Sequence, residues 1–489
     1  MTQAAAVFGA LGVAGILLAR SRAALIAGLG VLGAATAVLA AAAPGGSLAI
    51  TFTTPAGVVA AIVGLAIVGA LAAALVRFPT AAVALLLLAA PLRLPIARDP
   101  GSPLLLGLAS GGGLGRLYLF YAVLAAAAAA LVWRLLRDDD FRPLPRAIAI
   151  PATALVALTS LSLLWSRDEA EGAVALAFFW LPFAALLAVV AHTPLTPRSE
   201  RILATALVAE ATVFAAIGIY QAAGRRLFFF DPDLLRANEL GSLFRVTSMF
   251  PDPSQYGRHL VIAIAVVLVA LWLSQLRLAV GAALVALLGA GLYFSYSQSS
   301  MVALAVVAVA VALLAGDRLG RRVVAIACLA IALVGAGVLA AAIAGGSAES
   351  VTSRRSTLVA SAGTVFVNHP LIGVGVAAQP RVTRAEVDPT TTTGRNTSHT
   401  QPLTVAAELG VIGLVAYVAF LAGAVRVLLA AHLRRPQLAL GLAAIFLALF
   451  AHSLFYPGFF ENPITFGVLG LAAAVVMSPT DGPRESRTR

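Results

Sequence analysis

The chain has 489 residues, of which 61% are hydrophobic and 11% charged, and its formal net charge is +12. Soluble domains average about 45–50% apolar and about 25% charged residues, so this composition excludes a water-soluble globule and predicts a protein that resides in the bilayer. All 33 basic residues are arginines, and they lie between apolar blocks. That distribution is typical of membrane topology and excludes a nucleic-acid-binding face.

About fifteen apolar blocks follow one another, and each approaches the ~20 residues that a helix needs to cross ~30 Å of hydrocarbon. They lie at 4–19, 23–43, 55–76, 79–92, 115–136, 146–165, 173–192, 201–222, 259–275, 277–295, 298–315, 322–344, 406–430, 437–456 and 462–478. The block 79–92 is short and flanked by proline. No basic residue precedes the first block, so it is interpreted as a span and not as a signal peptide. We predict an all-α polytopic membrane protein with roughly 12–15 transmembrane helices.

The arginines indicate the orientation, because cytoplasmic loops carry an excess of basic residues. Alternating spans place on one side Arg20, Arg22, Arg77, Arg134, Arg137, Arg142, Arg146, Arg198, Arg201, Arg277, Arg318, Arg321, Arg322, Arg434, Arg435, Arg484, Arg487 and Arg489. The short loops of the other side hold Arg93, Arg98, Arg116 and Arg167. The arginine-rich side is predicted to be cytoplasmic, which places the C-terminus inside. The N-terminus then lies outside if the block 79–92 is a span.

Two long polar segments, 223–258 and 345–405, then fall outside the membrane. Loops of this size between tight connections are usually functional or disordered. Within the second, residues 353–368 have helical apolar spacing and are predicted to form a helix at the membrane interface. The expected organisation is N-terminal transmembrane helices (1–145), a transmembrane core that includes both outer loops (146–478) and a cytoplasmic tail (479–489).

His399 precedes the span that begins near Ala406, which places it at the outer membrane surface. An imidazole there titrates near neutral pH and can act as a general base for a sugar hydroxyl, or it can be a polar interfacial residue. Glu408 begins the following helix, where the helix dipole favours a negative charge. It could orient His399 or Arg355, or simply cap the helix.

The exterior arginines Arg245, Arg354 and Arg355 form the second set of candidates. Guanidinium groups stay charged and grip phosphate with two hydrogen bonds, as a polyprenyl-diphosphate donor would require. The alternative is that each contacts lipid headgroups.

Other ionisable residues suggest structural roles. His369 precedes a proline in a glycine-rich turn, His452 lies within a late span, and His192 ends a span. Glu210 lies near the middle of a span, where an ionisable group is costly; it is either functional or hydrogen-bonded to a neighbouring helix. The chain has no P-loop, no HExxH and no Cys/His cluster with zinc spacing, so we predict neither a metal nor a cofactor.

Four segments together resemble the O-antigen ligase and polymerase superfamily. They are His399-Thr400-x9-Gly410-x-x-Gly413, HPLIGVGVAAQP (369–380), FRVTSMFPDPSQYG (244–257) and SYSQSSMVALAV (295–306). Thr400 stands where the family usually has Asn, Ser or Gln, and Gln298 stands where many members have Arg. The resemblance covers about 150–478 and its motifs occur in the family's order.

The resemblance implies a metal-independent glycosyltransferase of the membrane-embedded C type (GT-C-like). Such an enzyme takes glycan from a polyprenyl-diphosphate lipid at the outer face of the cytoplasmic membrane and joins it to a glycan or lipid acceptor. By this likeness His399 would be the base, and Arg245 and Arg355, with Arg354 beside them, would hold the diphosphate and stabilise the leaving charge. Glu408 would orient these groups. Membrane lipids are the other expected partners.

A secondary transporter is the main alternative. Transporters concentrate paired polar groups and broken helices at the bilayer midplane, where this chain offers only Glu210 and His452. Its polar residues are concentrated in the two outer loops, which favours the enzyme. A catalytically inactive scaffold is a third possibility. Ligase and polymerase differ only in the acceptor, which the sequence does not specify.

Overall fold

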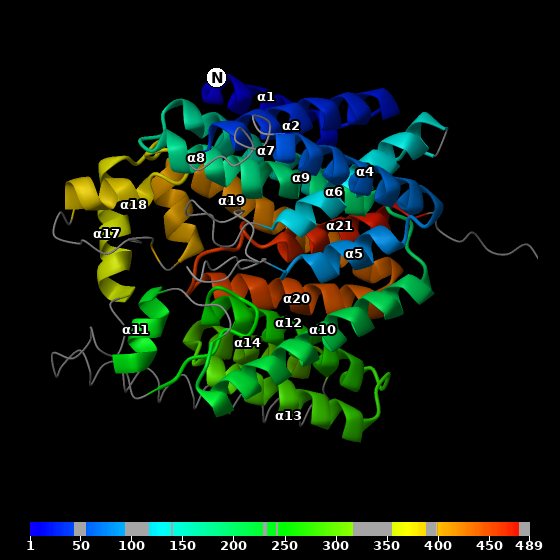
Figure 1. The fold of residues 1–489 in the computed structure, drawn as a ribbon, viewed down its shortest axis with the longest axis vertical. Helices are drawn as coiled ribbons and strands as arrows, with labels where there is room; N and C mark the ends of the chain where they lie inside the picture. Colours follow the sequence, from blue (N-terminus) through cyan, green and yellow to red (C-terminus); the bar gives the residue numbers. More distant parts are fainter. Residues whose placement is uncertain are drawn as a thin grey trace, which may run out of the picture.

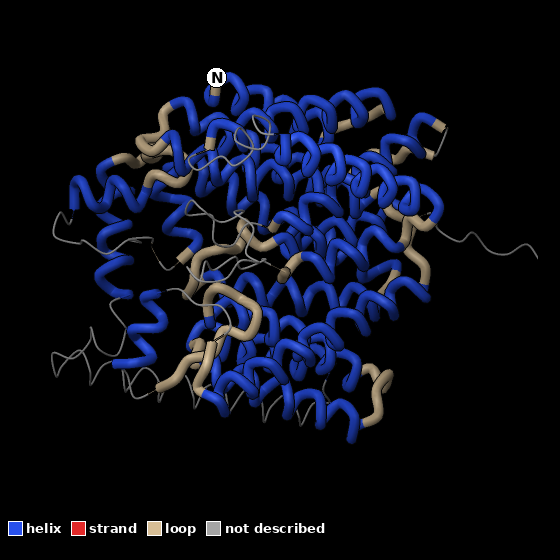
Figure 2. The backbone as a smooth tube through the Cα atoms, viewed as in Figure 1, coloured by secondary structure: helices blue, strands red, loops and turns tan. Residues whose placement is uncertain are grey.

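The computed structural model describes residues 1–43, 55–92, 117–137, 140–227, 232–240, 243–315, 355–387, 398 and 400–478. Every regular element in these ranges is helical, and no strand occurs among them (Figure 2). The long helices lie side by side along a common direction, and the chain passes repeatedly between the two ends of the bundle (Figure 1). The predicted all-α fold is confirmed.

The helices begin and end close to the predicted spans. They are α1 (Thr2–Leu17), α2 (Arg22–Ala42), α4 (Pro55–Arg77), α5 (Ala81–Ala89), α6 (Tyr118–Leu136), α7 (Arg146–Leu161), η1 (Ser162–Leu164), α8 (Glu169–Ala175), η2 (Leu176–Trp180), α9 (Leu181–Ala191), α10 (Pro197–Gly224), α11 (Pro232–Leu240), α12 (Pro253–Trp272), α13 (Leu278–Ser295), α14 (Gln298–Ala315), α17 (Arg355–Asn368), α18 (Gln379–Val382), η3 (Thr383–Val387), α19 (Gln401–Arg434), α20 (Pro436–Ser453) and α21 (Pro463–Met477). The predicted block 322–344 lies outside the described residues.

Helix α12 begins earlier than the apolar pattern indicated. The side chain of Asp252 accepts hydrogen bonds from the backbone amides of Ser254 (2.7 Å) and Gln255 (3.2 Å), so a cap extends the helix through polar residues. The segment predicted as an interfacial helix forms α17.

Within the described residues, nine helical segments are long and apolar enough to cross a membrane. Shorter apolar helices, including α1, α14 and α21, pack among them. Helix α5 differs from expectation. It has 9 residues and so extends about 13 Å, which does not cross a bilayer. The block 79–92 therefore supplies no complete span within the described part of the chain.

Two apolar cores hold the bundle together. The first joins α1, α2, α6, α7 and α9 from the early part of the chain with α19 and α21 from its end. The second joins α10, α12, α13 and α14. Helix α20 lies between them, with Leu442 and Leu449 in the first core and Ala444 and Ala448 in the second.

The two ends of the bundle differ in charge and in loop length. At one end, which we call the arginine end, guanidinium groups bind the last carbonyls of helices. These bonds run from Arg134 to His192 O (3.2 Å), from Arg142 to Met477 O (2.6 Å) and from Arg434 to Ser478 O (2.7 Å). The opposite end, which we call the loop end, carries α11, α17 and α18 (Figure 1). The described parts of both predicted outer segments thus reach the same end, opposite to the arginine end.

The orientation can be tested with cysteines at exposed positions of each end. Leu371 at the loop end is 66% exposed and Leu433 at the arginine end is 86% exposed. In a Cys328→Ser background, Leu371→Cys should react with a membrane-impermeant maleimide in cells with a permeabilised outer envelope, because the positive-inside rule places the loop end outside. Leu433→Cys should react only after lysis. The reverse labelling pattern would invert the topology.

Candidate active site

Helix α19 is broken at Gly410, whose backbone angles are φ 65° and ψ −163°. Residues 369–376, from the connection between α17 and α18, fill the break with backbone hydrogen bonds. The bonds run from Val374 N to Ala407 O (3.0 Å), from Gly375 N to Glu408 O (2.8 Å) and from Val411 N to Pro370 O (2.8 Å). They satisfy backbone N–H and C=O groups that lose their partners within α19 at the break. We call residues 369–376 together with Gly410 the glycine lock.

Glycine is required where the two backbones of the lock touch. A Cβ atom on Gly410 would lie 2.2 Å from the carbonyl oxygen of Leu371, and one on Gly373 would lie 2.4 Å from that of Glu408. Both glycines also have positive φ, 65° and 66° respectively, where side chains are disfavoured. One contact therefore explains Gly373 of the HPLIGVG segment and Gly410 of the motif after His399.

The lock is also bound on its other side. The hydroxyl of Ser162 accepts the amide of Val376 (3.0 Å), and the hydroxyl of Ser166 donates to the carbonyl of Val376 (3.0 Å). The amide of Arg167 donates to the carbonyl of Val374 (3.1 Å). The connection between α7 and α8 therefore holds the lock against α19.

The residue that precedes position 399 is fixed by α18. The buried side chain of Gln379 accepts the amide of Ser398 (3.1 Å) and donates to the hydroxyl of Thr383 (2.8 Å). The Ser398 hydroxyl lies 2.7 Å from that of Thr404, within α19. Helix α18 is itself held by Glu408, whose carboxylate accepts the backbone amides of Ala377 and Gln379.

The residues that follow position 399 are fixed by the connection between α20 and α21. The side-chain oxygen of Gln401 accepts the amides of Gly458 and Phe459, each at 3.3 Å. The carbonyl of the same Gly458 accepts a hydrogen bond from Nη1 of Arg258 (3.1 Å), a guanidinium on α12 that is only 6% exposed. Position 399 therefore lies between two anchors, and one of them connects directly to a buried cation.

Acidic and phenolic groups surround Arg258. Tyr456 forms a side-chain hydrogen bond with Asp252, and burial together with the charge of Asp252 raises the pKa of the phenol. The phenol therefore stays protonated and donates to the carboxylate. The carboxylate of Glu461 lies beside Gly458 and interacts electrostatically with Glu408. These groups form a polar cluster at the loop end, between α12, α19 and α21.

Arg245 is held on the loop that leads to α12. Its backbone pairs with the side chain of Asn238, which accepts the Arg245 amide (3.0 Å) and donates to its carbonyl (2.9 Å). Its Nε donates to the carbonyl of Ser295 (3.3 Å). We call residues 295–300, where α13 passes into α14, the serine-rich turn. The hydroxyl of Ser300 in this turn donates to the carbonyl of Ser254 in the first turn of α12 (3.3 Å). Arg245 and the first turn of α12, which precedes Arg258, therefore both contact the serine-rich turn.

The sequence model of the O-antigen ligase family matches residues 282–418. We refer to residues 282–418 as the O-antigen ligase domain, after the family model that they match. Family members are glycan-transferring enzymes of the ligase or polymerase type. The comparison with curated proteins gives no match. The O-antigen ligase domain contains the serine-rich turn, the whole glycine lock and position 399. Arg245 and Arg258 precede it in sequence but contact it, or its anchor at Gly458, in space.

The structure places some of the predicted site residues and not others. Arg245 and Glu408 lie at the loop end, as described above. Arg355 is the first residue of α17, and its side chain lies outside the description, as do His399 and Arg354. Their roles remain predictions. For His399 the prediction is supported by the anchoring of Ser398 and Gln401.

Glu210 has a partner on a neighbouring helix. Its Oε2 lies 3.6 Å from Nε2 of His259 on α12, and both side chains are buried, 8% and 4% exposed. The two side chains thus contact each other between helices, at a distance longer than a hydrogen bond. Similarly, Nε2 of His452 on α20 lies 3.1 Å from the hydroxyl of Ser299 on α14, so its predicted role between helices is confirmed.

His192 and His369 also contact other protein groups, as their predicted structural roles require. Both ring nitrogens of His192 face carbonyls, of Ala188 (2.8 Å) and Arg142 (3.1 Å), and burial lowers its pKa. His369 lies 3.3 Å from the carboxylate of Glu386 on the surface of the loop end.

Four residues with clear positions in the site were not singled out from the sequence: Arg258, Gln379, Gln401 and Tyr456. Arg258 lies in the polar first turns of α12, directly before the apolar run, and this position next to a span is the signal that could have identified it. Tyr456 lies in the short YPGFFENP connection, which is similar to an ordinary turn between spans. For Gln379 and Gln401 the local sequence carries no signal, because their partners are distant in the chain.

Proposed function

We propose that this protein transfers glycan from a polyprenyl-diphosphate lipid to an acceptor hydroxyl at the loop end, on the outer face of the cytoplasmic membrane. The observation that carries the proposal is the double anchoring of position 399. Ser398 is held by Gln379, and Gln401 is held by the amide of Gly458, the residue whose carbonyl Arg258 binds. A base at this position is presented where a lipid-borne donor and a water-side acceptor meet.

In the proposed reaction His399 takes the proton of the acceptor hydroxyl, and the oxygen attacks the anomeric carbon of the donor sugar. The bond between that carbon and the diphosphate oxygen breaks, and the diphosphate leaves with its electron pair. Arg245, Arg354 and Arg355 bind the diphosphate and stabilise the charge that develops on it. No step requires a metal ion, because arginines supply the positive charge.

Glu408 is assigned a positioning role in this scheme. Its carboxylate is bound by the amides of Ala377 and Gln379 at the start of α18, and Gln379 in turn fixes Ser398. Glu408 thus acts on His399 through α18. The unit proposed for catalysis is the predicted core 146–478, since its α12 and its α20–α21 connection both contribute to the site around the O-antigen ligase domain.

The transporter alternative has less support. Its two candidate midplane residues both have protein partners, Glu210 with His259 and His452 with Ser299. The broken helix α19 does resemble a transporter feature. However, the backbone groups at its break are bonded to residues 369–376, which leaves the polar groups of the loop end as the best candidates for a site.

The donor-binding arginines can be tested directly. Arg245→Ala and Arg355→Ala should each lower the transfer rate at limiting donor roughly tenfold or more, because a lost charge-assisted contact costs about 1.5–3 kcal/mol. Lys at either position should restore part of the rate, since it keeps the charge but lacks the two-pronged geometry. The measurement is the initial rate with a labelled lipid-linked glycan and purified protein.

Arg381→Ala is the matched control, because this exposed arginine at the same end pairs with Asp168 (3.6 Å) outside the proposed site. It should retain the wild-type rate. Full activity of both Arg245→Ala and Arg355→Ala at limiting donor would show that these arginines contact only headgroups.

A further inference from the structure

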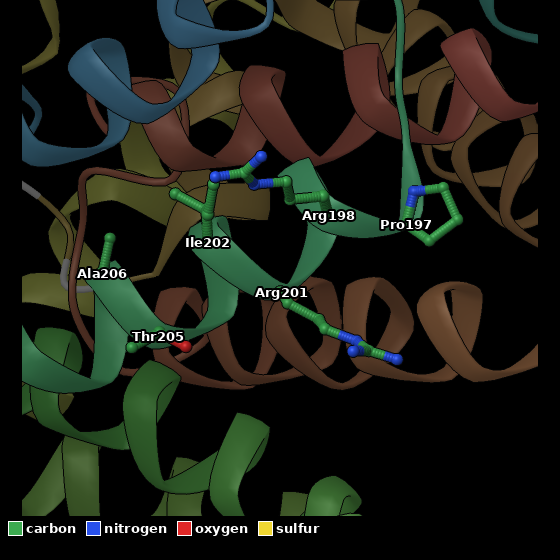
Figure 3. Close-up of a pocket in the computed structure, with 6 residues that line it drawn as sticks. All are labelled: Pro197, Arg198, Arg201, Ile202, Thr205 and Ala206. Carbon is green, nitrogen blue, oxygen red and sulfur yellow. The ribbon is translucent and has the colours of Figure 1, made fainter.

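Helix α10 carries an open hollow on its first turns, at the arginine end of the bundle. The hollow has a volume of about 540 Å³ and is lined by Pro197, Arg198, Arg201, Ile202, Thr205 and Ala206 (Figure 3). In Figure 3 the Arg198 guanidinium lies over Ile202, while Arg201 extends away on the other side. Two cations therefore border the hollow, and the next turn of α10 is largely apolar.

The two cations are available to an outside ligand. Neither Arg198 nor Arg201 takes part in an ion pair with the described residues, and the neighbouring carboxylate of Glu200 is paired with Arg435. The first turn of α10 adds the partial positive charge of a helix N-terminus. Within the described structure the hollow thus has positive charge and no anion to balance it.

The same face of α10 continues as a lipid-facing stripe. Ile202, Val213 and Tyr220 are 47%, 56% and 67% exposed, and their spacing places them on one side of the helix. Helix α10 is long and apolar enough to cross a membrane, so this exposed stripe contacts hydrocarbon. A ligand that covers both parts of the face must have an anionic head and an apolar tail.

We propose that this face of α10 binds one anionic phospholipid. Its phosphate interacts with Arg198 and Arg201, and an acyl chain lies along Ile202 toward Val213. A soluble protein cannot cover the stripe inside the hydrocarbon layer, whereas anionic headgroups occur at this depth and are attracted by basic residues next to a span. The proposal concerns the end opposite to the catalytic site and does not depend on the transfer reaction.

The test is native mass spectrometry of the purified full-length protein in detergent, titrated with phosphatidylglycerol and, separately, with phosphatidylcholine. The wild type should prefer phosphatidylglycerol. Each arginine near a headgroup contributes about fivefold in affinity, so Arg198→Gln/Arg201→Gln should weaken phosphatidylglycerol binding roughly 25-fold. The matched control is Arg20→Gln/Arg277→Gln, which removes two exposed arginines of the same end and should leave the affinity unchanged.

Three other outcomes would overturn the proposal. The first is unchanged phosphatidylglycerol binding by the Arg198/Arg201 double variant, or an equal loss in the control. The second is competition by glycerol 1-phosphate as strong as that by the lipid, which would indicate a site for a free phosphate ester. The third is a dimer that the double substitution converts to a monomer without a change in lipid affinity, which would assign the face to a second copy of the chain.

Discussion

Replacing His399 by alanine is expected to remove most glycan transfer while leaving the amount of protein in the membrane unchanged. An acceptor hydroxyl is a poor nucleophile at neutral pH, and a positioned base contributes about 10²–10⁴-fold. The backbone on either side should keep its place, because Ser398 and Gln401 are anchored through their own hydrogen bonds. His399→Gln should transfer little better, since an amide cannot take the proton.

The measurement is transfer of a labelled lipid-linked glycan by protein in nanodiscs without added divalent metal. Wild-type activity should fall as the pH drops below the imidazole pKa, and this limb should be absent from the residual activity of the variant. His432→Ala is the control, because that exposed imidazole lies in the last turn of α19, at the arginine end, and has no proposed part in the reaction. Near-normal turnover by His399→Ala would rule out the base, and loss of wild-type activity on chelation would rule out the metal-free reaction.

The second large effect is expected at the glycine lock. Gly410→Ala places a methyl group 2.2 Å from the carbonyl oxygen of Leu371 at a backbone conformation with φ 65°. The conformation alone should cost about 1–3 kcal/mol for a non-glycine residue, and relief of the clash must separate α19 from residues 369–376. We expect a lower unfolding temperature, faster proteolysis between α17 and α19, and loss of transfer, because Glu408 and Gln379 would move with the lock.

Gly363→Ala is the matched control for this substitution. Gly363 lies on the neighbouring helix α17, where a Cβ atom meets nothing within 4 Å. That variant should keep wild-type stability and activity, since alanine is a better helix former than glycine. If Gly410→Ala behaves like Gly363→Ala, the lock does not determine the geometry of the site.

The helices were predictable because their signal is local. Runs of apolar residues between arginines located nearly every described helix, and the alternation of charge separated the loop end from the arginine end. The exception is instructive. The block 79–92 has the composition of a span, but its helix is confined to Ala81–Ala89, because composition does not determine where a helix ends within the bundle.

The contacts of the site could not be predicted in the same way. The fit of Gly410 against Leu371, and of Gln401 against Gly458, joins segments that are distant in sequence and carry no periodic signal. For Glu210 the sequence limited the choice to a functional group or a hydrogen-bonded one, but only the structure identifies His259 as the partner. Sequence thus indicated which residue types belong to the loop end, whereas packing determines which of them meet.

The position of α19, α20 and α21 has a consequence for biosynthesis. Helix α7 packs against α19 and helix α9 packs against α21, while α20 contributes residues to both cores. A ribosome adds about 5–20 residues per second, so the early helices are complete tens of seconds before their partners emerge. During that interval their glycine- and alanine-rich faces are exposed to lipid or to the insertion machinery. Helices α19, α20 and α21 therefore complete the packing of the described bundle, and nascent chains that stop before α19 should be the substrates that membrane proteases remove first.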